Sequence, residues 1–289
     1  MKTITRRKFI GTTAKGLAAV WALSQLPQQL LAQFQETFSD IPIGFQTFPI
    51  RDMLAKDFAG TLKMMAGLGY KQTEMCSPKG YEKIGYGPLL NMKTADMRKT
   101  ITDAGLTCPS CHFTFAEFDA GKLDASIEFS QQLGLSHMIC SSFWIQDTAT
   151  LNDYLVAADK LNKAAEKIKS AGMQAGFHNH SFEFLKLDGQ LVYDALLKRF
   201  DADLVKMQFQ TEVINKGYKA ADYFTKYPGR FISAHLSDWT ADKKQVPVGQ
   251  GIIDWKEFFA AAKTGGVKTF FVEMDMDKFK DSAKYIQGL

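Results

Sequence analysis

Residues 171–180, AGMQAGFHNH, contain the unit that repeats along this chain. A helix-like stretch ends at Gly172, a short apolar run follows, and polar residues come at the end of that run. Glycine adopts the left-handed backbone conformation that ends a helix at little steric cost. We therefore interpret Gly172 as a boundary between a helix and a strand, and not as part of a binding site.

The same arrangement of glycine, apolar run and polar end recurs along the chain. The other instances are GLGYKQTEM (67–75), AGLTCPSCHF (104–113), LGLSHMICSSF (133–143) and GGVKTFFVEM (265–274). Three further strands are predicted at 41–48, near 203–209 and near 230–236. Apolar residues recur every three or four positions at 150–170, which is the spacing of an amphipathic helix. Weaker helical patterns cover 53–67, 93–104, 122–133, 189–199 and 254–264.

These segments make eight strand–helix units within residues 33–289. Strands that alternate with helices pair in parallel, because each return connection is helical. Eight such units in about 250 residues have the size of a TIM barrel. An open doubly wound sheet is the alternative, but the segment after the first strand, GFQTFPIRD (44–52), lacks a G-x-G-x-x-G phosphate loop. We therefore predict a single (β/α)8 TIM barrel over residues 33–289.

Residues 1–32 have the features of a cleavable export signal. The pair Arg6 and Arg7 precedes a moderately apolar run that ends at the small residue Ala32, a pattern of the twin-arginine type. An amphipathic helix or a membrane anchor is the alternative, but Lys15 interrupts the run, which is short for a membrane span. We predict that this segment is removed and that the mature protein is periplasmic.

The charge of the chain gives no sign of a nucleic-acid partner. Residues 1–32 carry five of the 35 basic residues and none of the 31 acidic ones, so the formal charge of +4 becomes −1 without them. No basic stripe remains that could follow a phosphate backbone. No later hydrophobic run is long enough for a membrane span, and the sequence leaves the oligomeric state open.

Polar side chains follow the predicted strands at the end where a TIM barrel places its chemistry. They are, in chain order, Gln46, Glu74, His112, His178, Asn179, His180, Glu183, Gln208, Gln210, His235, Asp238, Glu273 and Asp275. Imidazole and carboxylate ligands together suit a divalent ion of the Mn, Zn or Co type, with open positions for substrate oxygens. We predict Glu183, His235 and Glu273 as ligands.

The second half of the chain carries a recognisable pattern. It consists of GFHNHSFEF (176–184), SAHLSDW (233–239), VGQGIIDWKEFF (248–259) and FFVEM (270–274). Together these segments resemble the sugar phosphate isomerase/epimerase family of xylose-isomerase-like TIM barrels, over residues 41–289. The resemblance implies a metal held by Glu, Asp, His and Glu from strands five to eight. With an export signal, it implies a periplasmic carbohydrate enzyme.

The sixth strand departs from the family pattern. Relatives commonly read FELD there, whereas this chain reads MQFQ at 207–210. The resemblance thus places Gln208 at the expected Glu and Gln210 at the expected Asp ligand. An amide carbonyl can ligate a cation but brings no negative charge. The predicted ligands are Glu183, Gln210, His235 and Glu273, and the nearby His178 and His180 leave the choice of fifth-strand ligand open.

The resemblance implies proton transfer beside a sugar carbonyl. A metal polarises the carbonyl and acidifies the adjacent C–H, one carboxylate removes the proton, and a second group returns it. The product is an isomer or epimer; if the intermediate expels a leaving group, as on a 3-keto-sugar, the enzyme is a lyase. We assign catalysis to Glu183, Glu273 and His112. We assign substrate binding to Gln46, Glu74, Asn179 and His180.

The segment CPSCH (108–112) has the letters of a haem-attachment site and begins like a thiol redox pair. We predict a strand here, on which Cys108 and Cys111 point to opposite faces. A redox pair instead needs the first turn of a helix, and a zinc site needs a second pair of cysteines. We expect buried thiols; one disulfide among Cys76, Cys111 and Cys140 stays open for an exported protein.

A non-catalytic carbohydrate-binding barrel is the alternative function. Gln208 and Gln210 favour it, because they remove the acids of the sixth strand. Aromatic residues in FTFAEF (113–118), SSFWIQ (141–146) and SDW (237–239) suit stacking on sugar rings in either case. A stoichiometric divalent metal would favour the enzyme.

Overall fold

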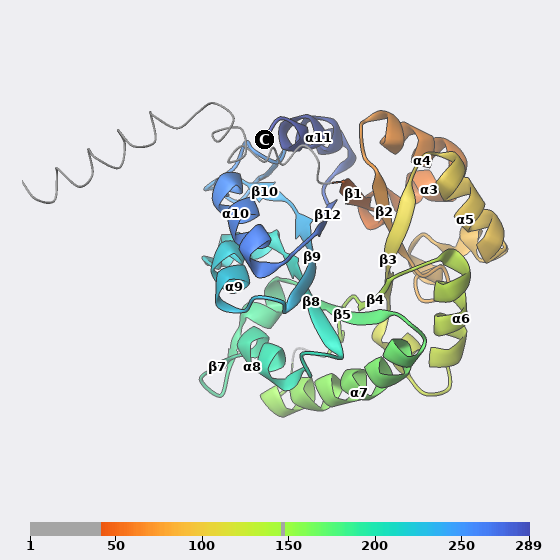
Figure 1. Ribbon diagram of the computed structural model, residues 1–289. Coiled ribbons are helices and arrows are strands. Elements are labelled where there is room, and N and C mark those ends of the chain that lie inside the picture. Colours follow the sequence, from red (N-terminus) through yellow and green to blue (C-terminus); the bar gives the residue numbers. More distant parts are fainter. Residues whose placement is uncertain (1–41, 146–147) are drawn as a thin grey trace, which may run out of the picture. The chain divides into compact units, whose positions relative to one another are not determined.

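The computed structural model describes residues 42–145 and 148–289, which contain a closed barrel of eight parallel strands. The strands are β1 (Ile43–Gln46), β2 (Gln72–Cys76), β3 (Thr107–Phe113), β4 (His137–Cys140), β5 (Gln174–His178), β8 (Val205–Gln210), β9 (Phe231–Leu236) and β12 (Thr269–Val272). They follow one another around the barrel in chain order, and β12 pairs with β1 to close it (Figure 1). The predicted TIM barrel is confirmed, whereas the predicted export signal, residues 1–32, lies outside the described residues.

Helices connect successive strands and surround the barrel (Figure 1). They are α3 (Arg51–Lys56), α4 (Phe58–Gly67), α5 (Thr94–Asp103), α6 (Leu123–Leu133), α7 (Leu151–Ser170), α8 (Val192–Arg199), α9 (Ala220–Lys226), α10 (Trp255–Gly265) and α11 (Phe279–Gln287). The helix predicted at 53–67 is two helices. Asp57 separates them, because its side chain accepts a hydrogen bond from the amide of Gly60 (2.8 Å) and caps α4. The helices α9 and α11 lie in the two units for which no helix range is predicted.

Short elements lie in the loops. They are the hairpins β6 (Lys186–Leu187) with β7 (Gln190–Leu191) and β10 (Asp238–Trp239) with β11 (Gln245–Val246), and the 3-10 helices η2 (Phe48–Ile50), η3 (Glu82–Ile84), η4 (Gly87–Leu89), η5 (Phe115–Phe118), η6 (Ser181–Phe184), η7 (Thr211–Lys216) and η8 (Met276–Lys278). The helix η6 follows β5 directly and carries the end of the HNHSFEF segment.

Glycine ends the helices as the sequence predicts. Gly134 caps α6 with a φ of 86°, and Gly172 follows α7 with a φ of 85°. Both angles lie in the left-handed region, which glycine occupies without a steric penalty. The interpretation of these glycines as helix boundaries is confirmed.

The strand β8 shows how the barrel separates apolar from polar side chains. Phe209 packs outward against Tyr193 and Phe224, which belong to α8 and α9. The neighbouring residue Gln208 points to the opposite face, into the barrel, where its Nε2 donates a hydrogen bond to Glu74 Oε1 (2.8 Å). The helices therefore bury the apolar faces of the strands, and the interior near the strand ends is polar.

The CPSCH segment lies on β3, as predicted, and its cysteines take part in packing. All four cysteines of the chain are buried and free. Burial raises the pKa of the Cys108 thiol to about 12 and holds the pKa of Cys111 well above its ordinary value. The predicted buried thiols are confirmed, and the disulfide considered among them is not formed.

In the described part of the chain, no helix combines the length and apolar character needed to cross a membrane.

Candidate active site

Polar side chains from six of the eight strands, and from the residue after β12, meet inside the barrel at the carboxyl ends of the strands. They are Gln46, Glu74, Ser110, His112, His178, Gln208, Gln210, Ser233, His235 and Glu273. Glu273 keeps 18% of its side chain exposed, whereas the others are buried. Electrostatic interactions among them are strong, because little water screens the charges.

A hydrogen-bonded network around Glu74 forms the base of this cluster. We call Gln46, Glu74, Ser110, Gln208 and Ser233 the floor. The carboxylate of Glu74 accepts hydrogen bonds from Gln46 Nε2 (2.7 Å), Ser110 Oγ (2.5 Å) and Gln208 Nε2 (2.8 Å). Gln208 Nε2 also donates to Ser233 Oγ (2.9 Å). A buried carboxylate is stable when its oxygens are satisfied in this way.

Two histidines hold Glu74 in its charged form. His235 Nε2 lies 2.5 Å and His112 Nε2 lies 3.2 Å from Glu74 Oε2. Burial alone would raise the pKa of Glu74, but the charges and hydrogen bonds of His112 and His235 outweigh it and lower that pKa well below its ordinary value. The floor therefore carries a negative charge at neutral pH.

His235 lies between two carboxylates. Its Nε2 faces Glu74, and its Nδ1 lies 2.8 Å from Glu273 Oε2. Burial would lower the pKa of His235, yet Glu273 and Glu74 raise it to about 9. The same oxygen of Glu273 accepts a hydrogen bond from Gln210 Nε2 (2.6 Å). Three of the four predicted metal ligands thus lie together, because Gln210 and His235 both contact Oε2 of Glu273.

Three imidazoles form a second grouping that could hold a metal. Ligand nitrogens of His112, His178 and His235 all lie within 4.8 Å of one another. Nδ1 of His178 is buried and has no hydrogen-bond partner. Burial, followed by the neighbouring histidines, lowers the pKa of His178 well below its ordinary value, so its ring is neutral. A buried, neutral imidazole with a free nitrogen beside two further imidazoles fits a divalent cation of the zinc or manganese kind.

The loop after β5 contains several buried polar atoms without partners. We call His178, Asn179, His180 and Glu183 the rim. Besides His178 Nδ1, the unpartnered atoms are Asn179 Nδ2, His180 Nδ1 and Glu183 Oε1. Asn179 Oδ1 accepts from the amide of Gln210 (3.1 Å), and this bond ties the rim to β8. Burial lowers the pKa of His180 to about 4, so this ring is neutral at neutral pH.

Glu183, predicted as a ligand and a catalytic acid, lies within its own turn. Its Oε2 accepts a hydrogen bond from the amide of His180 (2.8 Å) in a capping arrangement at the start of η6. Burial raises the pKa of Glu183 to about 8, so its carboxyl is mostly protonated at neutral pH. Its hydrogen bond within the described chain goes to this turn, and not to Gln210, His235 or Glu273.

The predicted substrate-binding residues divide between the two regions. Gln46 and Glu74 belong to the buried floor, and Asn179 and His180 belong to the rim. The predicted catalytic residue His112 lies between the floor and the other histidines, with Nε2 2.7 Å from Gln208 Oε1. Sequence reasoning missed Ser110 and Ser233. Ser110 lies two positions before His112, and Ser233 lies two positions before His235. Alternate residues of a strand face the same side, so this spacing is the signal that could have found both serines.

Asp238, predicted as a polar strand-end residue, organises the segment VGQGIIDW. Its carboxylate accepts hydrogen bonds from the amides of Gly249 (2.9 Å) and Gly251 (3.0 Å) and from Trp255 Nε1 (2.8 Å). A Cβ on Gly251 would lie 2.1 Å from the Asp238 carboxylate, so only glycine fits there. This segment therefore folds around Asp238 and supports the loop after β9.

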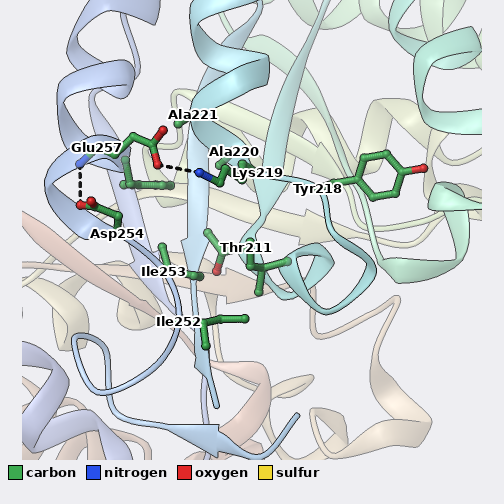
Figure 2. A pocket seen from close by; sticks show the side chains of 11 residues that line it. Thr211, Tyr218, Lys219, Ala220, Ala221, Ile252, Ile253, Asp254 and Glu257 are labelled. Carbon is green, nitrogen blue, oxygen red and sulfur yellow. Dashed lines mark hydrogen bonds and ion pairs between the residues drawn. The ribbon is translucent and has the colours of Figure 1, made fainter. Parts of the chain in front are cut away.

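A small cavity lies beside the barrel mouth, between the starts of α9 and α10 (Figure 2). Its volume is about 70 Å3, and its lining includes Thr211, Tyr218 and Ile252. The ion pair between Lys219 and Glu257 (3.1 Å) crosses its wall. None of the floor or rim residues lines it, so it is separate from the candidate site.

Fold and site together define a TIM barrel with a candidate metal centre at the carboxyl ends of its strands. A sequence profile described as "Xylose isomerase-like TIM barrel" matches residues 62–289, and the chain belongs to this family. No curated protein matches the chain in sequence.

Solved structures show the same fold. A sugar phosphate isomerase/epimerase from Parabacteroides distasonis is 23% identical, with 86% of this chain and 96% of that chain covered at a TM-score of 0.74. The probable 3-DHS dehydratase AsbF of Bacillus anthracis, involved in petrobactin synthesis, is 12% identical, with 85% and 98% covered at a TM-score of 0.66. A xylose isomerase-like TIM barrel protein from Mycobacterium smegmatis in complex with magnesium is 13% identical, with 88% and 98% covered at a TM-score of 0.65.

Proposed function

We propose that this protein is a metal-assisted carbohydrate enzyme that transfers a proton beside a carbonyl, as an isomerase, an epimerase or a lyase. The observation that carries the proposal is the buried, unpartnered Nδ1 of His178, whose ring centroid lies 4.4 Å from that of His235, the partner of Glu273. Leaving such a nitrogen without a partner costs about 1–3 kcal/mol, and a bound cation removes that cost. Family membership and the names of the similar structures support the reaction class.

His178, His235 and Glu273 would hold the metal, with the side-chain carbonyl of Gln210 as a fourth, weaker ligand. We place His178 at the position predicted for Glu183, because Glu183 Oε2 accepts a hydrogen bond within its own turn. A bound divalent ion would polarise the substrate carbonyl and acidify the C–H next to it. Glu74 orients His235, because its hydrogen bond at Nε2 leaves Nδ1 directed toward Glu273.

Glu273 is the residue best placed to accept a substrate proton. Burial would raise its pKa, but the charge and hydrogen bond of His235 lower it, so the carboxylate is ionised. It is also the partly exposed carboxylate of the cluster. His180, neutral and half-buried at the rim, can donate a hydrogen bond to a substrate hydroxyl. The floor residues Gln46 and Glu74 support the site from below and do not contact the sugar in this proposal.

The test combines metal content with hydrogen exchange. Protein loaded with Mn²⁺, Zn²⁺ or Co²⁺ is incubated in D2O with ketosugars and 3-keto-glycosides, and loss of the substrate C–H signal is followed by NMR. We expect one ion per chain and exchange that depends on it. His178→Gln should weaken metal binding at least tenfold, whereas Glu183→Gln should leave it within about twofold. Wild-type protein that neither binds metal nor exchanges protons would refute the proposal.

A non-catalytic carbohydrate-binding barrel is the second candidate. The observation in its favour is that Gln208, in place of an acid, already has partners in His112, Glu74 and Ser233. Such a protein would bind a sugar with the same affinity in the presence and absence of a chelator, and it would show no exchange in D2O.

We also propose that the protein is exported and loses residues 1–32. The support is the sequence pattern around Arg6, Arg7 and Ala32. Mass spectrometry of protein from the native cell envelope should find an N-terminus near Gln33. An intact Met1 in that fraction would contradict the proposal.

A further inference from the structure

Trp144 is an unusual residue in the loop between β4 and α7. The residue is 62% exposed, which is the largest value among the exposed large hydrophobic residues of the described chain. Its φ of 49° lies in the left-handed region, where a bulky side chain is an outlier. Strained residues of this kind cluster at ligand sites, where the surrounding structure holds them in place.

The neighbours of Trp144 fix it in this conformation. Phe143 is buried, and its ring centroid lies 4.8 Å from Phe115 and 4.6 Å from Phe177. The amide of Trp144 donates to Oγ of the buried Ser142 (3.1 Å). The loop is thus anchored in the core on one side of Trp144, and the indole is presented to solvent.

Trp144 forms an aromatic surface with two residues that follow β5. Its ring centroid lies 5.7 Å from that of His180 and 6.2 Å from that of Phe182. His180 and Phe182 stack on one another, 5.1 Å apart with an interplanar angle of 6°. We call Trp144, His180 and Phe182 the platform. Exposed aromatic faces offer a large apolar contact area, and the C–H face of a sugar ring is a flat apolar partner for them.

The platform is continuous with the candidate metal site. The ring of His180 lies 4.8 Å from that of His178, which lies 4.4 Å from that of His235. A row of ring contacts therefore runs from His235 through His178 and His180 to Trp144. Trp144 would contact the part of a ligand that extends beyond the reacting ring.

We propose that the platform is a binding subsite for a second sugar ring, so that the ligand is a disaccharide or another glycoside instead of a single monosaccharide. This inference rests on the proposed function for the position of the first ring. It concerns binding, however, and can fail or succeed independently of turnover.

The test compares disaccharides with their constituent monosaccharides. Cellobiose, maltose, lactose and trehalose are titrated against glucose and galactose by calorimetry, with wild-type protein and the variants Trp144→Ala, Trp144→Phe and Val156→Ala. Val156 is an exposed apolar residue on α7 and serves as the control. For at least one disaccharide we expect tighter binding than for its monosaccharides, a loss of about tenfold in Trp144→Ala, and recovery of most of it in Trp144→Phe. Affinity for monosaccharides should change about twofold or less.

Three outcomes would overturn the inference. The first is a wild-type protein that prefers none of the disaccharides, whether or not it exchanges protons on monosaccharides. The second is an equal loss for both sugar classes in Trp144→Ala. The third is a change of molar mass in Trp144→Ala by light scattering, which would make Trp144 a contact with a second copy of the chain.

Discussion

The floor and the rim of the barrel mouth are both buried and polar, but they differ in how completely their polar atoms are satisfied. Every floor residue has hydrogen-bond partners among the described residues, with Glu74 at the centre. Each rim residue keeps one buried polar atom without a partner. A satisfied network fixes a structure, whereas unsatisfied buried atoms need a ligand or water. We infer that the floor positions the site and that the rim meets the substrate and metal.

One buried glutamate of the floor and one of the rim differ in their protonation state. Glu74 and Glu183 both have a side chain without solvent exposure. Glu74 is surrounded by donors, and its pKa lies well below its ordinary value. Glu183 receives a hydrogen bond from His180, and burial raises its pKa to about 8. The environment, and not the residue type, decides which of the two is an anion at neutral pH.

The largest effect should come from Glu273→Gln. This variant keeps the shape of the side chain but removes the partly exposed carboxylate, so turnover or proton exchange should fall by about 10²–10⁴-fold. Melting temperature is recorded alongside, with Glu257→Gln on α10 as an exposed control that should keep full activity. Wild-type rates in Glu273→Gln would show that Glu273 does not accept the substrate proton.

Glu74→Gln should break the floor. It removes the negative charge that faces His235 and His112, and breaking a buried ion pair of this kind costs about 3–5 kcal/mol of unfolding free energy. Ser233→Ala, which removes one neutral hydrogen bond, should cost about 1 kcal/mol. Urea unfolding of metal-free protein at pH 7 measures both.

The pH dependence of the Glu74→Gln effect has a definite sign. The lowered pKa of Glu74 means that its ionised form stabilises the folded state above the ordinary value of 4.5. That contribution is lost as the pH falls through the folded-state pKa, so the two proteins should converge in strong acid. A difference below about 1 kcal/mol at pH 7 would show that the floor does not stabilise the barrel.

Gln210→Asp should sharpen the metal site. The new carboxylate would lie near Glu273, which adds attraction for a divalent cation and repulsion without one. We expect metal affinity to rise about tenfold or more, and the metal-free protein to become less stable. Calorimetry with Mn²⁺ is the measurement, and Gln210→Asn, which stays neutral, is the matched control. Equal affinities in the two variants would place β8 outside the metal site.

Glu183→Gln should have the smallest effect. It should raise the free energy of unfolding, whereas Glu74→Gln should lower it. The folded state holds the proton of Glu183 up to about pH 8, whereas the unfolded state loses it near the ordinary value of 4.5. Wild-type stability therefore falls as the pH rises between these values. The variant should gain about 1 kcal/mol or more at pH 9 and nothing at pH 4, as measured by denaturant unfolding. A loss of stability at pH 9 would show that the carboxylate has a partner, such as a bound ion.

Part of the site follows from sequence and family resemblance, and part does not. His235 and Glu273 are predicted as ligands of one metal because both stand at strand ends, and the structure places them 2.8 Å apart. The contact between His235 and Glu74 spans 161 positions of the chain, and no local pattern indicates it. The choice between His178 and Glu183 likewise depends on which side chain is left without a partner after folding.

The sequence by itself determined the repeating units and hence the barrel, because helix periodicity and the glycine at each helix end act over a few residues. It also determined that CPSCH is a strand with buried thiols. Only the tertiary structure decided that Glu74 is an anion in the floor, that Glu183 is a protonated residue of its own turn, and that Trp144 is exposed in a strained conformation. The physical reason is that charge state, hydrogen-bond satisfaction and exposure depend on groups brought together by closure of the barrel.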